Sequence, residues 1–446
     1  MSDTASALAH DLIAAAIKAG ADAAEAAVAE RQSLSVGVRL GELEEVEREE
    51  SRDLGLRVFI GKRQASVSAS DLSPQTTARL VERAVAMAKL APEDPYCGLA
   101  PAEKLANGVR PDLDLYDPTE PSAAELEGWA RQAEDAARAV EGVTNSEGGS
   151  ASWSQGRWRL VTSGGFEGEH RGSASSLSAS VIAGEGSGME RGGEGRTTRW
   201  LTDLPAPDAI GRMAGERAIK RIGAKKLKSQ TATIIVENRI ASSMLSAFVG
   251  AISGAAVARG VSFLKDSLGK PVFGSNITLT DDPFRPRGLS SSPFDDEGVQ
   301  VTKRSLVDKG VLTTWLLNAS SARQLGLEST GHASRGLAGP PGTSAHNLHV
   351  EPGERDLDGL MADAGKGLLV TAMFGPSLNS NTGDWSAGVS GFWFEGGAIA
   401  YPVSEITIAG NLVEIYQRLV PGSDLEFRGS INSPSLLAEG VAIAGL

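Results

Sequence analysis

The sequence contains few of the residues that usually build compact chemical sites. Its 446 residues include one cysteine, Cys97, and five histidines. One cysteine excludes an internal disulfide framework and any zinc site made of several thiolates. We expect Cys97 to be an ordinary small side chain, and a single thiol suits a reducing compartment such as the cytoplasm.

Basic charge and long apolar runs are also scarce. The formal net charge is −13, which argues against a nucleic-acid partner, because phosphate binding needs clustered Lys and Arg. The N-terminal apolar run LIAAAI is far shorter than the roughly 20 residues of a membrane-spanning helix. The N-terminus also begins with an acidic rather than a basic segment, unlike a signal peptide. We therefore expect a cytoplasmic chain without nucleic-acid or membrane contacts.

Hydrophobic periodicity predicts an α+β protein. Amphipathic spacing indicates helices over 5–19, 76–90, 122–140 and 207–222. Short alternating segments between them predict strands, and the lack of a βαβ pattern predicts an antiparallel sheet in a mixed α/β N-terminal region. We expect an N-terminal α+β domain over 1–110, a central α+β region over 111–228, and a C-terminal domain over 229–446. The last should be largely antiparallel β with a central helix.

A glycine- and glutamate-rich stretch, GEGSGMERGGEG at 184–195, superficially resembles a nucleotide-binding loop. No apolar helix follows it, and its glutamates would repel a phosphate. We interpret this stretch as a loop and expect no nucleotide cofactor.

No common catalytic motif is present in the chain. It has no HExxH zinc helix, no GxSxG nucleophile turn and no Walker A loop. His346 and His349 are three residues apart in a segment that reads as loop or strand, where they would point to opposite faces. We therefore expect two surface or partly buried histidines rather than a metal-binding pair.

The acidic run Asp295-Asp296-Glu297 is the strongest cluster of carboxylates in the second half. Three consecutive carboxylates cannot all face one cation from a regular element, so the run is expected to form a polar turn closed by Gly298. From the residues alone, no catalytic constellation is indicated.

Longer runs in the second half are more specific than any short motif. They are AFVGAISGAAV at 247–257, SFLKDSLGK at 262–270, SPFDDEGV at 292–299, DKGVLTTWLLNASSARQLGLESTGHA at 308–333 and YPVSEITIAGNL at 401–412. These runs resemble the TldD/PmbA family of peptidase subunits, on its PmbA (TldE) side. The resemblance is strong in the C-terminal half, whereas the N-terminal half fits the family's architecture more loosely.

The resemblance implies that the catalytic helix of the family is degenerate here. In the family's catalytic subunit this helix carries HExxxH, whose zinc ligands and base fall on Ser246, Ala247 and Ala251 of this chain. Serine and alanine can neither bind zinc nor act as a base. The family's further Cys ligand is missing from the corresponding stretch, GSINSPSLLAEG. We therefore expect no catalytic residue, metal or cofactor in this chain, and zinc in a partner subunit.

The function implied by the resemblance is that of a non-catalytic half of a heteromeric metalloprotease. Its partner would be a TldD-like zinc-bearing subunit, and its substrates peptides or unfolded polypeptides cut in a shared cavity. Candidates for that cavity or for the subunit interface are Asp295, Asp296, Glu297, His332, His346 and His349.

Two alternatives remain open. One is a peptide-binding or chaperone-like homodimer without a protease partner, since the isolated chain could pair with a second copy. The other is a self-sufficient metallopeptidase built on the histidines or on the acidic run.

Overall fold

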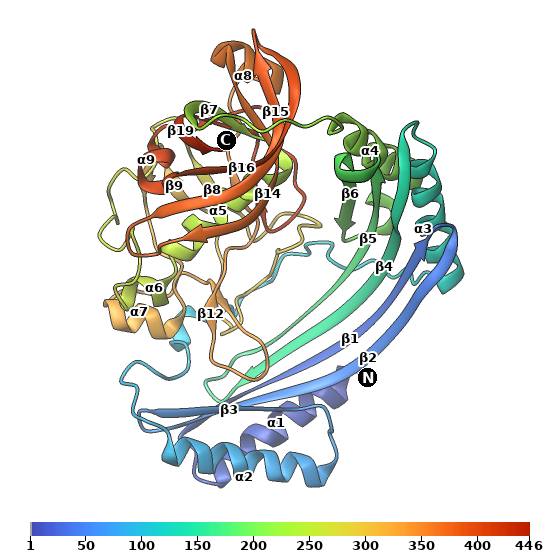
Figure 1. The fold of residues 1–446 in the computed structure, drawn as a ribbon. Helices are drawn as coiled ribbons and strands as arrows, with labels where there is room; N and C mark the ends of the chain where they lie inside the picture. Colours follow the sequence, from blue (N-terminus) through green and yellow to red (C-terminus); the bar gives the residue numbers. More distant parts are fainter. Residues whose placement is uncertain (1) are drawn as a thin grey trace.

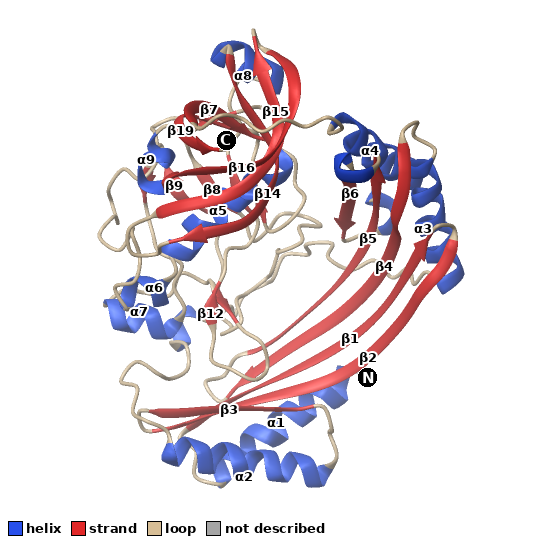
Figure 2. Ribbon diagram, viewed as in Figure 1, coloured by secondary structure: helices blue, strands red, loops and turns tan. Residues whose placement is uncertain are grey.

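The structure is a computed structural model that describes residues 2–446. A long curved sheet from the first half of the chain faces a β-rich body from the second half (Figure 1). This arrangement confirms the α+β class, with helices packed outside the long sheet and one helix inside the C-terminal body (Figure 2).

The N-terminal sheet has six antiparallel strands in the order β3-β2-β1-β4-β5-β6. Its strands are β1 (Ala23–Arg39), β2 (Glu42–Ile60), β3 (Arg63–Ala69), β4 (Val143–Thr162), β5 (Glu167–Ala183) and β6 (Glu190–Thr198). Because β1 pairs along its length with β4, the sheet runs across the boundary expected near residue 110. The first two regions of the sequence therefore form one continuous layer.

Four helices cover the outer face of this sheet in two pairs. They are α1 (Ser2–Lys18), α2 (Pro74–Leu90), α3 (Ala123–Arg138) and α4 (Pro207–Lys220), close to the helices predicted from the sequence. The first pair buries leucine, valine and alanine side chains against one end of the sheet, and the second pair does so at the other end. The start of α3 is set by a capping box, in which Ser122 and Glu125 satisfy each other's backbone N–H groups.

The expectation of a loop over 184–195 is only half right. A short 3₁₀ turn spans Gly186–Gly188, and residues 190–195 belong to the edge strand β6. Its glycines serve packing rather than ligand binding, because a Cβ atom on Gly192 would collide with the backbone of Ala214 and Ala218 in α4. The missing side chain allows the strand and the helix to approach closely.

The C-terminal body contains two larger sheets and a short hairpin. One sheet has the order β16-β15-β14-β7-β19-β17, the other β10-β9-β8-β13-β18, and β11 pairs with β12. The first consists of β7 (Gln230–Val236), β14 (Lys366–Leu378), β15 (Asp384–Glu395), β16 (Ala398–Asn411), β17 (Val420–Pro421) and β19 (Leu436–Ala444). The others are β8 (Leu279–Asp281), β9 (Arg304–Asp308), β10 (Val311–Leu312), β11 (Ala333–Ser334), β12 (Gly342–Thr343), β13 (Leu348–Val350) and β18 (Ile431–Asn432). Most pairs are antiparallel, but β14 with β7 and β13 with β18 are parallel.

The helix α5 (Asn238–Ala251) lies in the largest hydrophobic core of the molecule. Phe248 meets the rings of Phe273 and Tyr416 edge-on, and the Tyr416 hydroxyl donates to the Met244 carbonyl at 2.8 Å. The remaining helices are short: α6 (Gly254–Ala258), α7 (Ala319–Leu325), α8 (Leu357–Ala364) and α9 (Leu412–Gln417). The central helix predicted for this domain is thus present and deeply packed.

We predict that Gly192→Ala destabilises the protein, while the neighbouring Gly193→Ala does not. The new methyl group at 192 would overlap the α4 backbone, whereas at 193 the nearest atom would lie at an ordinary 3.4 Å. Overpacking of this kind costs about 1–3 kcal/mol. Thermal unfolding of the two variants measures the difference, and equal melting temperatures would contradict the packing role of Gly192.

Candidate functional site

The helix α5 offers no side chain that could hold a metal or move a proton at the three degenerate positions. Ser246 is exposed and its hydroxyl donates to the Ser242 carbonyl at 3.1 Å. Ala247 is half-buried, and Ala251 packs in the core with 6% of its surface exposed. Within residues 2–446, no cluster of three His, Cys, Asp or Glu ligands lies on this helix. In this chain α5 is a packing element.

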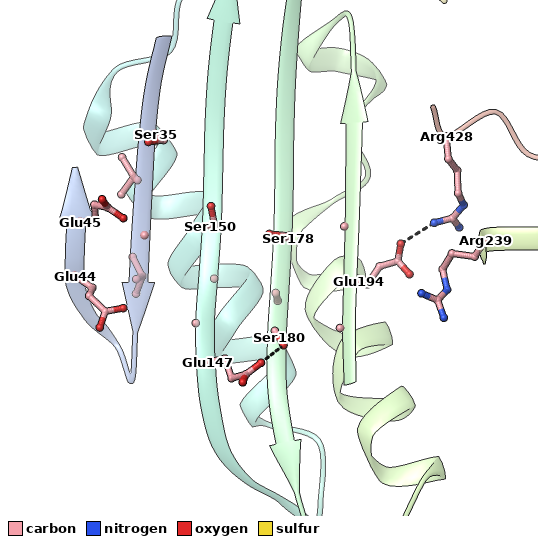
Figure 3. A pocket seen from close by; sticks show the side chains of 18 residues that line it. Ser35, Glu44, Glu45, Glu147, Ser150, Ser178, Ser180, Glu194, Arg239 and Arg428 are labelled. Atoms are coloured by element: carbon pink, nitrogen blue, oxygen red, sulfur yellow. Dashed lines mark hydrogen bonds and ion pairs between the residues drawn. The ribbon is translucent and has the colours of Figure 1, made fainter. Parts of the chain in front are cut away.

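A polar cleft of about 660 Å³ separates the inner face of the N-terminal sheet from the C-terminal body (Figure 3). The sheet side carries hydroxyl groups and the carboxylates of Glu44, Glu45, Glu147 and Glu194. The opposite side carries two guanidinium groups, Arg239 from the first turns of α5 and Arg428. The Arg428 guanidinium donates to Glu194 at 2.9 Å, so an ion pair crosses the cleft.

The acidic run forms a turn, and its carboxylates face inward. Asp295 accepts hydrogen bonds from the backbone N–H groups of Glu297 at 3.0 Å and Val299 at 2.8 Å. Gly298 closes the turn with φ of +79°, a left-handed conformation that favours glycine. However, Asp295 and Glu297 are only 3% and 2% exposed, so this is no solvated surface turn.

Glu297 belongs to a buried group of charges that joins the two halves of the chain. Arg57 on β2 lies 3.1 Å from Glu25 on β1 and 4.0 Å from Glu297. Arg335, which follows β11, pairs with the same Glu25 carboxylate. All four side chains are at most 2% exposed. We call Glu25, Arg57, Glu297 and Arg335 the interdomain ion cluster.

The other two members of the acidic run support the same contact. Asp295 accepts the Ala333 N–H at 3.0 Å, and Asp296 accepts the Arg335 N–H at 2.8 Å. These hydrogen bonds hold the segment of Ala333 and Arg335 in place. Arg335 is thereby positioned to pair with Glu25 of the N-terminal sheet. The structure thus brings Asp295, Asp296 and Glu297 to an interface within the chain.

Burial governs the protonation of these carboxyl groups. It raises the pKa of Glu297 from 4.5 to about 7, although the Ala319 N–H and the Arg57 charge favour the ionised form. Burial and the neighbouring Glu297 together raise the pKa of Asp295 well above its usual range. Asp296 is shifted in the same direction, again mainly by burial.

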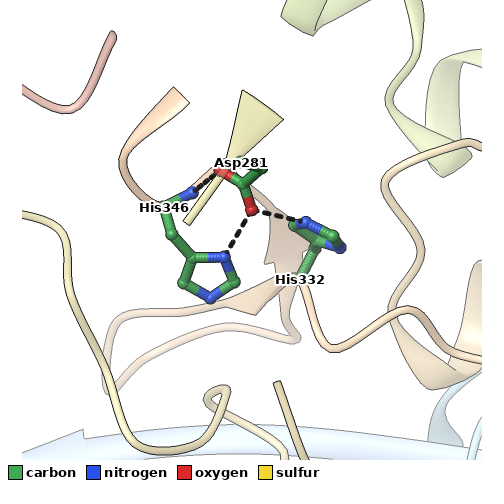
Figure 4. Close-up of side chains that lie close together, drawn as sticks. All are labelled: Asp281, His332 and His346. Carbon is green, nitrogen blue, oxygen red and sulfur yellow. Dashed lines mark hydrogen bonds and ion pairs between the residues drawn. The ribbon is translucent and has the colours of Figure 1, made fainter. Parts of the chain in front are cut away.

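The three candidate histidines do not form one site. His332 and His346 lie close together and share Asp281, whose Oδ2 is 3.0 Å from His332 Nε2 and 2.8 Å from His346 Nδ1 (Figure 4). His349 lies apart, 3.3 Å from Glu351 Oε1 and with its ring edge-on to Phe427. His346 and His349 are 8% and 9% exposed, so both are more buried than the expected surface or partly buried histidines.

Asp281 was missed by reasoning from the sequence. It ends the buried strand β8 and is itself fully buried. Burial alone would raise its pKa, but the hydrogen bonds from His332 and His346 hold that pKa below its usual value. Burial lowers the pKa of His332. The one available signal was the sequence ITLTDD, an apolar strand that ends in two carboxylates.

Cys97 is not part of either cluster. It is a buried free cysteine, and burial raises the pKa of its thiol. A raised pKa disfavours the reactive thiolate, consistent with an ordinary side chain.

Comparison with known sequences and structures defines the class of protein. Family profiles described as PmbA/TldA metallopeptidase domain 1, central domain and C-terminal domain match residues 24–88, 116–222 and 229–445. The chain is 39% identical to metalloprotease PmbA of Escherichia coli O157:H7 over 95% of its length and 92% of that protein. It is 37% identical to the metalloprotease PmbA homolog of Haemophilus influenzae, covering 96% and 94% of the two chains. The chain therefore belongs to the PmbA/TldD family, on its PmbA side.

Solved structures share the fold of this chain. A protein from Bacteroides thetaiotaomicron described as a candidate modulator of DNA gyrase superimposes with a TM-score of 0.92 at 30% identity, covering 100% and 99% of the two chains. TldE from Thermococcus kodakarensis has the same fold, with a TM-score of 0.84 at 22% identity over 98% and 100% of the chains.

Membrane-spanning helices need a long apolar stretch, and the helices of this chain can be compared with that requirement. None of those within residues 2–446 has the length and apolar character required to cross a bilayer.

We predict that Glu297→Gln changes how stability depends on pH. The raised pKa means that the folded protein holds a proton that the unfolded chain releases between pH 4.5 and about 7. The free energy of unfolding of the parent therefore falls relative to that of the variant as pH rises through this window. The relative loss is about 1.4 kcal/mol per pH unit, on the order of 3 kcal/mol in total.

Chemical denaturation of both proteins at pH 5, 6, 7 and 8 measures this difference. Glu328→Gln is the matched control, because Glu328 is 76% exposed. If the difference in unfolding free energy between the parent and Glu297→Gln stays constant from pH 5 to 8, the raised pKa of Glu297 is contradicted.

Proposed function

We propose that this chain is the non-catalytic subunit of a heteromeric TldD/PmbA-type metalloprotease. The observation that carries the proposal is α5, a helix retained in full and packed in the core, whose three family positions hold Ser246, Ala247 and Ala251. A zinc peptidase needs three protein ligands and a base near the metal-bound water. Such groups would have to come from another subunit.

The partner in this proposal is a TldD-like subunit that carries the catalytic zinc. Membership of the PmbA/TldD family and the metalloprotease names of the relatives support proteolysis as the activity of the assembly. The likeness to TldE supports the choice of the PmbA side. This chain would supply one wall of the compartment in which the partner cuts.

The substrate class in this proposal is peptides and unfolded polypeptides. The cleft is lined by strands on one side, with hydroxyl, carboxylate and guanidinium groups facing it. The edge strand β6 borders the cleft, and an extended peptide can add to a sheet edge through main-chain hydrogen bonds, which tolerate many side chains. A folded domain would not fit a cleft of about 660 Å³.

The alternative of a self-sufficient metallopeptidase is weaker. The histidine pair that could serve it surrounds Asp281, and Asp281 and His332 are 0% and 1% exposed. A peptide substrate could not reach those groups. A peptide-binding homodimer would use the same cleft but would need no partner subunit. The reconstitution experiment described below distinguishes it from our proposal.

We also propose a cytoplasmic location for the assembly. The support is compositional: a chain with one buried, unpaired cysteine gains nothing from an oxidising compartment.

The test is reconstitution with a zinc-bearing family member from the same genome. We predict that the purified chain alone does not cleave an unstructured fluorogenic peptide, and that the mixture does. A chelator should abolish the activity of the mixture, and readdition of zinc should restore it. Chelator-sensitive cleavage by this chain alone would contradict the proposal, and failure to co-purify with any such member would favour the homodimer.

A further inference from the structure

We propose that Asp281, His332 and His346 form a binding site for a divalent transition-metal ion of the zinc class. The three side chains come from separate segments: the end of β8, the residue before β11 and the loop before β13. Their ligand atoms lie within 4.8 Å of one another, and all three residues are buried. This ion would be structural and distinct from the catalytic zinc assigned above to the partner.

The distances suit a small ion. Asp281 Oδ2 lies 3.0 Å from His332 Nε2 and 2.8 Å from His346 Nδ1. Two ligands of a tetrahedral zinc ion lie roughly 3.3 Å apart, because each metal–ligand bond is roughly 2.0–2.1 Å long. Asp281 Oδ2 needs to separate from each of the two nitrogens by only a few tenths of an ångström. The ligand atoms of the two imidazoles, which lie within 4.8 Å of each other, would close around the ion. Two imidazoles and one carboxylate favour zinc, cobalt, nickel or iron over calcium or magnesium.

Two of the three groups, Asp281 and His332, are oriented by further hydrogen bonds, as ligands in metal sites are. Asp281 Oδ1 accepts the backbone N–H of His346 at 2.8 Å, which leaves Oδ2 directed at the imidazoles. His332 Nδ1 lies 2.8 Å from the Thr330 hydroxyl. That hydroxyl is also 3.3 Å from the Leu317 carbonyl. When a metal displaces the Nε2 proton, His332 can carry its proton on Nδ1 and donate it to Thr330, which donates in turn to Leu317.

One cation lies near the site and is directed elsewhere. Arg304 on β9 stands opposite Asp281 in the strand register, but its guanidinium donates to Thr302 Oγ1 at 2.6 Å. The side-chain partners of the Asp281 carboxylate are therefore the two histidines. The side chain of His346 is 10% exposed, which provides the side from which an ion and a bound water would enter.

The position of the site gives the ion a structural consequence. His332 and His346 flank residues 333–345, the segment that contains the β11–β12 hairpin. Arg335 of this segment pairs with Glu25 in the interdomain ion cluster. The Leu337 backbone lies so close to Gly55 on β2 that a Cβ atom there would collide with it. An ion at Asp281 would fix both ends of the hairpin that joins the C-terminal body to the N-terminal sheet.

The experiment is titration of the chelator-treated, dialysed full chain with Zn²⁺ alone, followed by calorimetry and by thermal unfolding. We expect one ion per chain and a melting temperature that rises with zinc. His332→Ala and His346→Gln should each weaken binding by about 100-fold or more, since loss of supporting groups alone costs roughly 10–100-fold. Co²⁺ should give the visible absorption of a tetrahedral site in the parent and not in these variants.

His349→Ala is the matched control, because His349 is as buried as His346 and pairs with Glu351 but has no third ligand. It should bind zinc like the parent. Absence of one-to-one binding by the parent, or retention of binding by His346→Gln, would overturn the proposal. If His332→Ala does not fold, His346→Gln decides alone, because its side chain borders the surface. No partner or peptidase assay enters this test, so its outcome is separate from that of the proposed function.

Discussion

A buried group of four ionisable side chains, the interdomain ion cluster, holds the long sheet against the C-terminal body, and the cleft between these two bodies depends on that contact. Glu25 and Arg57 come from the sheet, and Glu297 and Arg335 from the other side. Removing charges from water is costly, and their attraction offsets this cost only when the geometry is good. Loss of Glu25 would leave the buried guanidinium groups of Arg57 and Arg335 without their shared carboxylate, and an uncompensated buried charge typically costs about 3–5 kcal/mol. The two bodies are therefore held in one relative position.

Other contacts also hold the N-terminal sheet and the C-terminal body together. The Arg323 guanidinium of α7 donates to the carbonyl oxygen of Tyr96 at 2.8 Å, which ties the C-terminal body to the connection after α2. At the other end of the cleft, Glu194 of β6 pairs with Arg428. A rigid frame of this kind holds the two bodies in place without any contribution from the residues at positions 246, 247 and 251. In α5, core packing by Met244 and Phe248 preserves the helix, whatever residues stand at the ligand positions.

Local features of the fold could be predicted from the sequence, because local rules determine them. The four N-terminal helices follow from apolar spacing, the start of α3 from its capping box, and the turn at Gly298 from the residues around it. The sequence predicted a loop in place of strand β6, because glycine-rich segments usually form loops. The glycine at 192 is needed instead for close packing against α4, which is distant in the sequence. The degenerate positions on α5 were found only through resemblance to a family, since serine and alanine carry no chemical signal of their own.

The contacts between distant segments could not be predicted in this way. Asp281 and His332 are separated by 51 residues, and Glu25 and Arg335 by 310. Nothing in their local sequence pairs them. The inward direction of Asp295 and Glu297 also depends on backbone N–H groups supplied by other elements, such as Ala333 and Ala319. An acidic run with no such partners would remain in water.

The most direct measurement of the central claim is peptide cleavage by the assembled complex when the partner's HExxxH glutamate is replaced by glutamine. If this chain is the non-catalytic half, the substituted complex should still assemble and should cleave no peptide, while the complex with the natural partner remains active. Persistent zinc-dependent cleavage by the substituted complex would contradict the account, because the chemistry would then have to reside in this chain.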